Sequence, residues 1–133
     1  MAEAGRIRII CLKAQPMARR RLVIFPHAGA GPAVYRPWLD HFSGDTELLA
    51  VQLPGRESAL AEPAFQDWAA MLPALTAAID TLPATPFALF GHSLGAVMAL
   101  AAARHLAARA PQQLSHVFVS GRPWPGTPAP PLP

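Results

Sequence analysis

Short, mostly apolar runs that alternate with longer helix-like stretches constrain the fold of this chain most strongly. Four such runs cover residues 22–25, 47–53, 87–90 and 116–119, and proline or glycine directly follows the first three. Strands buried on both faces of a parallel sheet have this continuous apolar character. A further run, 6–12, alternates in part between apolar and polar residues, which predicts an edge or half-buried strand.

Helical periodicity is found between these runs. Apolar side chains recur every three or four residues from Phe65 to Asp80, and Pro73 inside this stretch predicts a kink. Residues 94–109 are rich in alanine and apolar on nearly all sides, which predicts a buried helix, and a short helix is expected around 35–42. Strands that alternate with helices form right-handed βαβ units. We therefore predict an α/β fold with three α/β/α layers and a mostly parallel sheet.

Charge is sparse and unevenly placed. Only 14% of the 133 residues are charged, and residues 1–21 hold six of the eleven basic residues. The rest of the chain is slightly acidic, which argues against nucleic-acid binding despite a net charge of +3. No apolar run approaches the ~20 residues of a membrane span, so we expect a cytoplasmic protein without membrane contact. The single cysteine, Cys11, excludes an intramolecular disulfide, and we expect it to be buried in its strand.

The segment Gly91-His92-Ser93-Leu94-Gly95 carries the clearest chemical signal. It follows a predicted buried strand directly and opens a predicted helix directly, which is the context of a nucleophile elbow. The flanking Gly91 and Gly95 remove side chains that would clash in so tight a turn, and the turn lifts the Ser93 hydroxyl above the sheet edge. The N–H of Leu94 lies at the helix N-terminus and can point at a developing oxyanion.

A second loop of small residues, His27–Gly31, also follows a buried strand. Such a loop lets the backbone approach a ligand closely. In α/β-hydrolases the loop after this strand gives the second N–H of the oxyanion hole, and Ala28 is our candidate, with Leu94 as its partner. His27 and Gly29 belong to the same loop. We assign His27 to loop packing in preference to the role of a substitute base.

Five segments, in order along the chain, resemble type II thioesterases, the external editing enzymes of polyketide and non-ribosomal peptide assembly lines. The resemblance is carried by residues 22–31, 35–38, 52–57, 87–96 and 117–122. It implies a truncated α/β-hydrolase fold over 22–121. The basic stretch 1–21, with its edge strand, precedes that domain, and a proline-rich tail, 122–133, follows it where the lid of the family begins.

By the same resemblance, Ser93 is the acyl nucleophile, and the backbone N–H groups of Ala28 and Leu94 form the oxyanion hole. The substrate is an acyl thioester on the phosphopantetheine arm of an acyl or peptidyl carrier protein, and no separate cofactor or metal is implied. Arg56 and Glu57 are expected only to stabilise their own turn.

A base for Ser93 and an acid to orient that base are the missing parts. In α/β-hydrolases they follow the nucleophile in the order acid, then histidine, but no Asp or Glu follows Asp80 in this chain. His105 lies twelve residues along the predicted helix from Ser93, about 18 Å away. His116 begins a strand at the opposite end of the sheet. Both histidines are therefore expected to be structural.

We accordingly expect an N-terminal portion of a thioesterase in which hydrolysis is impaired. One alternative is a non-catalytic binding or complementing fragment, to which a second chain supplies Asp and His. A less favoured alternative is an acyltransferase, because those sites also use a Gly-His-Ser-x-Gly elbow. Without later strands to cover it, the strand at 116–119 is expected to be an exposed apolar edge.

Overall fold

The computed structural model describes residues 6–122, which form a single five-stranded sheet in the order β1-β3-β2-β4-β5. The parallel pairs are β3 with β2, β2 with β4, and β4 with β5, whereas β1 runs antiparallel to β3 at one edge. The predicted mostly parallel sheet is therefore confirmed, and so is the edge strand. The strands are β1 (Arg8–Cys11), β2 (Arg20–Phe25), β3 (Thr46–Gln52), β4 (Phe87–His92) and β5 (Leu114–Ser120).

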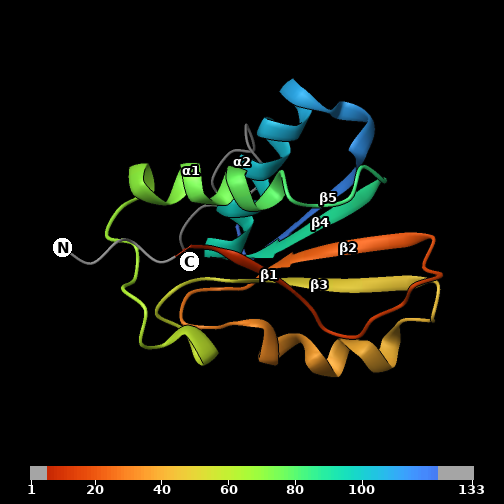
Figure 1. Ribbon diagram of the computed structural model, residues 1–133, viewed down its shortest axis with the longest axis horizontal. Helices are drawn as coiled ribbons and strands as arrows, with labels where there is room; N and C mark the ends of the chain where they lie inside the picture. Colours follow the sequence, from red (N-terminus) through yellow and green to blue (C-terminus); the bar gives the residue numbers. More distant parts are fainter. Residues whose placement is uncertain (1–5, 123–133) are drawn as a thin grey trace, which may run out of the picture.

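Helices cover both faces of this sheet. Figure 1 shows α1 (Trp68–Ile79) and α2 (Leu94–Arg109) on one side and the 3-10 helix η1 (Pro32–His41) on the other, which gives the three layers expected from the sequence. Two further 3-10 turns, η2 (Glu57–Ala59) and η3 (Pro111–Gln113), lie in connections. No helix within residues 6–122 is long and apolar enough to cross a bilayer.

The element predicted as a short helix around 35–42 begins earlier and is a 3-10 helix. Pro32 occupies one of its first two positions and Pro37 lies inside it. Pro37 has no N–H, so it interrupts the backbone hydrogen bonding of this segment. The segment presents the buried Tyr35 to the sheet.

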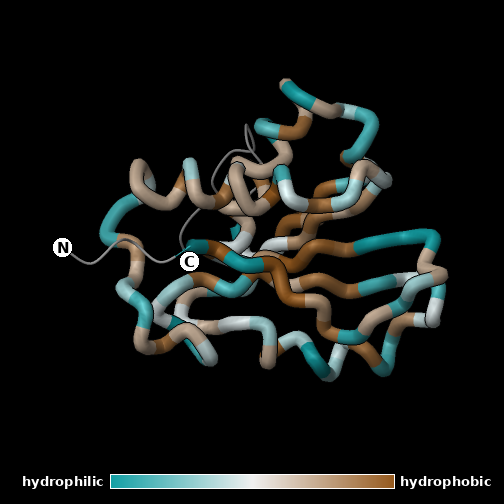
Figure 2. Tube along the Cα trace, viewed as in Figure 1, coloured by the Kyte–Doolittle hydropathy of each residue, from teal (hydrophilic) through white to brown (hydrophobic). Residues whose placement is uncertain are grey.

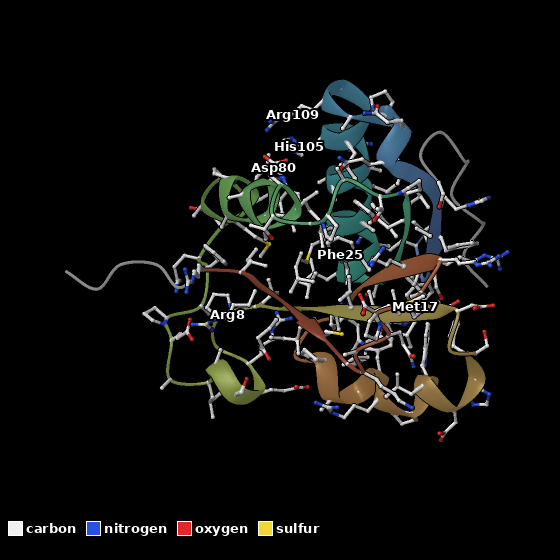
Figure 3. The ribbon with its side chains drawn as sticks, turned by 45° about the vertical axis from the view of Figure 1, so that its right-hand side comes forward. Arg8, Met17, Phe25, Asp80, His105 and Arg109 are labelled. Carbon is white, nitrogen blue, oxygen red and sulfur yellow. The ribbon has the colours of Figure 1, made fainter. Side chains whose placement is uncertain are left out.

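The core consists of two apolar layers, one on each face of the sheet. Val23 and Phe25 of β2 face the helices α1 and α2, whereas Ile24 faces η1, and none of the three is exposed to solvent. Burying a side chain of this size contributes roughly 1.5–3 kcal/mol. Figure 2 shows the hydrophobic residues concentrated on the central strands, and Figure 3 places Phe25 in the middle of the molecule.

Two burial predictions were wrong. The strand β5 is not buried on both faces, because it is the last strand of the sheet, and Phe118 is 51% exposed. This observation confirms, for the described part of the chain, the exposed apolar edge expected at 116–119. Cys11 is exposed, because it ends the edge strand β1. Apart from Arg122, the predicted proline-rich tail lies outside the described residues.

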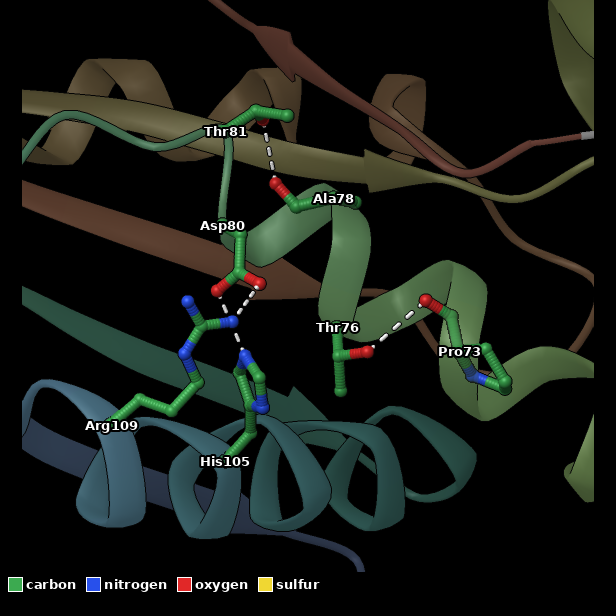
Figure 4. A network of polar contacts seen from close by, with 7 residues as sticks. All are labelled: Pro73, Thr76, Ala78, Asp80, Thr81, His105 and Arg109. Carbon is green, nitrogen blue, oxygen red and sulfur yellow. Dashed lines mark hydrogen bonds and ion pairs between the residues drawn. The ribbon is translucent and has the colours of Figure 1, made fainter.

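The two long helices are joined at one end by a polar network (Figure 4). The carboxylate of Asp80, which caps the C-terminus of α1, accepts a hydrogen bond from His105 at 2.8 Å and pairs with Arg109 at 2.6 Å. The pKa of Asp80 lies below its ordinary value, first because of the hydrogen bond from His105 and further because of the charges of His105 and Arg109, while burial acts in the opposite direction. His105 therefore connects α2 to α1, which agrees with its predicted structural role.

This network makes part of the stability depend on pH. Because folding lowers the pKa of Asp80, its contribution is present above the ordinary carboxyl pKa of about 4 and is lost as the pH falls through the folded-state value. We expect Asp80→Asn to reduce the free energy of unfolding by about 0.5–1 kcal/mol at pH 7. The loss should shrink toward pH 3 in urea-unfolding curves. Asp40→Asn, at an exposed position of η1, is the matched control. An equal loss at both pH values would contradict the assignment.

Candidate active site

Ser93 is the single residue between the end of β4 and the start of α2. Its backbone has φ 56° and ψ −115°, a conformation that non-glycine residues seldom adopt. Holding such a residue costs on the order of 1–3 kcal/mol and is typical of functional sites. The strand, strained turn and helix predicted for a nucleophile elbow are therefore all present, and the Ser93 side chain is only partly buried.

Close backbone packing explains why glycines flank this serine. A Cβ at Gly91 would overlap the carbonyl of Gly95 and lie 2.6 Å from the N atom of Ala96. A Cβ at Gly95 would overlap the carbonyl oxygen of Phe25 and lie 2.9 Å from that of Pro26. Only glycine fits either position, so the start of α2 rests directly on the end of β2.

The neighbouring strand β5 also fixes the elbow. The N–H of Ser93 donates to the carbonyl of Ser120 at 2.8 Å, which continues the parallel ladder of β4 and β5 into the turn. The side chain of His92 is held by the same residue, because its Nδ1 lies 3.0 Å from Ser120 Oγ. The carboxyl end of β5 is thus part of the framework around the candidate nucleophile.

The predicted oxyanion loop lies beside the elbow, because it leaves β2 at the point where Gly95 packs. It turns tightly, with the N–H of Ala30 donating to the carbonyl of His27 at 3.1 Å and Gly29 at φ 81°. Ala28 is exposed at the tip of this turn. At the other side, the first N–H groups of α2, including that of Leu94, have no acceptor within their own helix. The oxyanion roles of Ala28 and Leu94 stay predictions.

Two of the five histidines, His27 and His92, lie together near the elbow, and the other three have separate surroundings. The rings of His27 and His92 meet edge to face with centroids 5.8 Å apart, at the carboxyl ends of β2 and β4. His105 is engaged with Asp80, and His116 stacks on Phe118 of the same strand at 5.9 Å. His41 ends η1.

Sequence reasoning missed how the turn after β3 contacts the oxyanion loop and the start of η1. The Glu57 carboxylate accepts from the N–H of Ala33 at 3.0 and 3.2 Å, and the Arg56 guanidinium reaches the carbonyl of His27 at 3.5 Å. The expectation that Arg56 and Glu57 only stabilise their own turn was therefore wrong. The sequence feature that could have indicated this contact is Gln52, a polar residue at the end of an apolar strand.

Gln52 anchors that turn from the core. It is 2% exposed, and its amide donates to the carbonyls of Leu53 at 2.9 Å and Arg56 at 2.8 Å. Ser58 donates to the Gln52 side-chain oxygen at 3.4 Å. A buried amide whose bonds are satisfied in this way fixes the backbone that it contacts.

The described residues form a groove that is separate from the elbow. This groove of about 900 Å³ lies on the η1 side of the sheet, and Ser93 does not line it. Its apolar walls include Trp38, Phe90 and Phe118, and arginines 19–21 line it as well. This groove therefore does not open onto the Ser93 side chain.

Comparison with known proteins agrees with this architecture. A model of the thioesterase domain family matches residues 20–131. The gramicidin S biosynthesis protein GrsT of Aneurinibacillus migulanus is 34% identical over 111 residues, which cover 84% of this chain and 43% of GrsT. The type II thioesterase BorB from the borrelidin biosynthetic cluster superposes with a TM-score of 0.78 at 34% identity, over 87% of this chain and 47% of BorB.

The fold also matches more distant enzymes. MGS-M2, an α/β hydrolase from a deep-sea metagenome library, superposes with a TM-score of 0.63 at 16% identity, over 85% of this chain and 40% of that enzyme. The fold is therefore that of the α/β-hydrolases. Within that class, the chain belongs to the thioesterase domain family, and it spans less than half the length of the relatives named here.

The contact between Gly95 and β2 can be tested by mutation. We expect Gly95→Ala to lower the free energy of unfolding by at least about 2 kcal/mol, because the new methyl group overlaps backbone rather than a movable side chain. Gly44→Ala is the matched control, since a Cβ there meets only the Gln15 side-chain oxygen at 3.6 Å. Denaturant unfolding measures both variants, and a Gly95→Ala variant as stable as the control would contradict the packing.

Proposed function

We propose that this chain carries the nucleophile and oxyanion-hole part of a serine hydrolase that releases acyl groups from thioesters on carrier proteins. The observation that carries the proposal is the strained backbone of Ser93 between β4 and α2, beside the loop that leaves β2. Membership of the thioesterase family and similarity to BorB support the choice of thioesters as substrates. Polyketide and non-ribosomal peptide assembly lines hold their acyl groups as thioesters on carrier proteins.

In the proposed reaction, Ser93 Oγ attacks the thioester carbonyl carbon while a base takes its proton. The tetrahedral oxyanion accepts hydrogen bonds from the N–H groups of Ala28 and Leu94, each of which is typically worth about 2.7–4 kcal/mol in the transition state. The C–S bond then breaks, and the phosphopantetheine thiol leaves with a proton. Water hydrolyses the acyl-Ser93 ester and regenerates the hydroxyl.

We further propose that the base and the acid that orients it come from polypeptide outside these 133 residues. No Asp or Glu follows Asp80, and His105 and His116 are engaged away from the elbow. In a serine protease whose catalytic triad is removed by mutation, the catalytic rate constant falls by a factor of around 10⁶. Hydrolysis by this chain alone is accordingly expected to be very slow.

A second candidate function is a binding or complementing role with a partner chain that carries Asp and His. The observation that favours it is the same absence of carboxylates after Asp80, together with a span of 43% of GrsT. This role keeps Ser93 as the nucleophile of a shared site and assigns the base to a separate chain, whereas the first proposal requires only that the base lie outside these 133 residues. The carrier protein is the expected partner in both.

The proposal can be tested by supplying the missing base in solution. Incubation with an acyl-N-acetylcysteamine thioester should acylate Ser93 slowly, and added imidazole should raise that rate at least about tenfold by acting as the general base. Intact-mass and peptide mass spectrometry measure the acyl adduct. Ser93→Ala should abolish it, whereas Ser115→Ala, at an exposed serine of β5, should not change it.

Two results would contradict the proposal. Acylation that persists in Ser93→Ala would place the nucleophile elsewhere. Turnover near 1 s⁻¹ without imidazole, far above the residual rates left after triad loss, would show that the chain contains its own base.

A further inference from the structure

Glu57 shares an unusual backbone property with Ser93. Within residues 6–122, these two are the only non-glycine residues with positive φ, at 45° for Glu57 and 56° for Ser93. Strain of this kind persists only where the surrounding structure enforces it. At Glu57 the enforcing contacts come from Gln52, whose buried amide holds the preceding carbonyl of Arg56 at 2.8 Å.

The strained backbone aims the Glu57 carboxylate across to the loop that leaves β2. Both carboxylate oxygens lie within hydrogen-bond distance of the Ala33 N–H, at 3.0 and 3.2 Å. The side chain also lies close to Gly31, where an added Cβ would meet the Glu57 carboxylate carbon at 2.5 Å and its Cγ at 2.9 Å. The contact therefore requires an acceptor oxygen at 57 and no side chain at 31.

Arg56 contacts the other end of the same loop. Its guanidinium lies 3.5 Å from the carbonyl oxygen of His27, which also accepts the N–H of Ala30 at 3.1 Å. The turn after β3 thus contacts the chain on both sides of Ala28, at His27 in the loop and at Ala33, which lies in η1 directly after the loop. A loop held at both ends has a fixed direction for the peptide N–H groups between them.

We infer that Glu57, assisted by Arg56, is a positioning residue that holds the His27–Gly31 loop so that the Ala28 N–H faces the reacting carbonyl oxygen. This inference rests on the proposed oxyanion role of Ala28. Oxyanion donors are effective because they are oriented before the reaction begins, so loosening the loop reduces transition-state stabilisation without removing a group that touches substrate. Glu57 itself makes no contact with the acyl group in this scheme.

Amide hydrogen exchange, resolved by residue with NMR, tests the inference independently of catalysis. In Glu57→Ala, the amides of Ala33 and Ala30, which donate the hydrogen bonds on either side of Gly31, should exchange at least about tenfold faster, the ratio expected from losing one hydrogen bond to a charged group. Glu57→Gln keeps an acceptor oxygen and should show a smaller change. Glu62→Ala is the matched control, because it removes a carboxylate that pairs with Arg8 on the surface.

Two exchange results would overturn the inference. Loop amides that exchange in Glu57→Ala as they do in Glu62→Ala would show that Glu57 does not hold the loop. Equal acceleration of loop amides and of the amides in β2 and β4 would show a general loss of stability. If Glu57→Ala fails to fold, Glu57→Gln still tests the inference, because the glutamine side chain has nearly the same shape as glutamate.

The rate of Ser93 labelling by a fluorophosphonate, with imidazole present, then connects the loop to the chemistry. Glu57→Ala should lower the second-order labelling rate at least about tenfold, with Glu57→Gln between it and the wild-type rate. Equal labelling of wild type and Glu57→Ala would overturn the positioning role while leaving the proposed function intact. No labelling of wild-type Ser93 would instead contradict the proposed function, and the exchange result would still decide whether Glu57 holds the loop.

Discussion

The direct contact between the backbone of Gly95 and the carbonyl of Phe25 is the interaction on which the candidate site depends. It brings the N-terminus of α2 onto the end of β2, so that the Ser93 elbow and the loop that follows β2 lie side by side. A larger residue at position 95 would separate the two elements and move Leu94 away from the loop that contains Ala28. The strain at Ser93 accompanies this contact, because the chain must turn sharply between β4 and the helix.

A second set of contacts controls the loop from the opposite side. The turn after β3 is fixed by the buried Gln52, and through Arg56 and Glu57 it reaches the loop that follows β2. The carboxyl ends of three adjacent strands therefore cooperate in placing a few backbone N–H groups. Two of the few charged residues of this chain, Arg56 and Glu57, thus make their contacts beside the same loop.

Sequence patterns predicted these strands and long helices well, because continuous apolar runs and helical periodicity report burial directly. The Ser93 elbow was predictable for a local reason: its glycines and its serine are adjacent in the chain. The contact of Glu57 with Ala33 was not, because it joins residues 24 apart and depends on the positive φ of Glu57. The exposure of Phe118 was predicted from the position of its strand at the edge of the sheet and not from its apolar pattern, because hydropathy does not specify what covers the last strand of a sheet.

A crystal structure of the chain with a phosphonate bound covalently to Ser93 tests the central claim most directly. The phosphonyl oxygen stands in for the oxyanion of the tetrahedral intermediate. Our account predicts that this oxygen lies about 2.7–3.1 Å from the backbone nitrogen atoms of both Ala28 and Leu94. A phosphonyl oxygen directed into solvent, with either N–H turned away from it, would contradict the account.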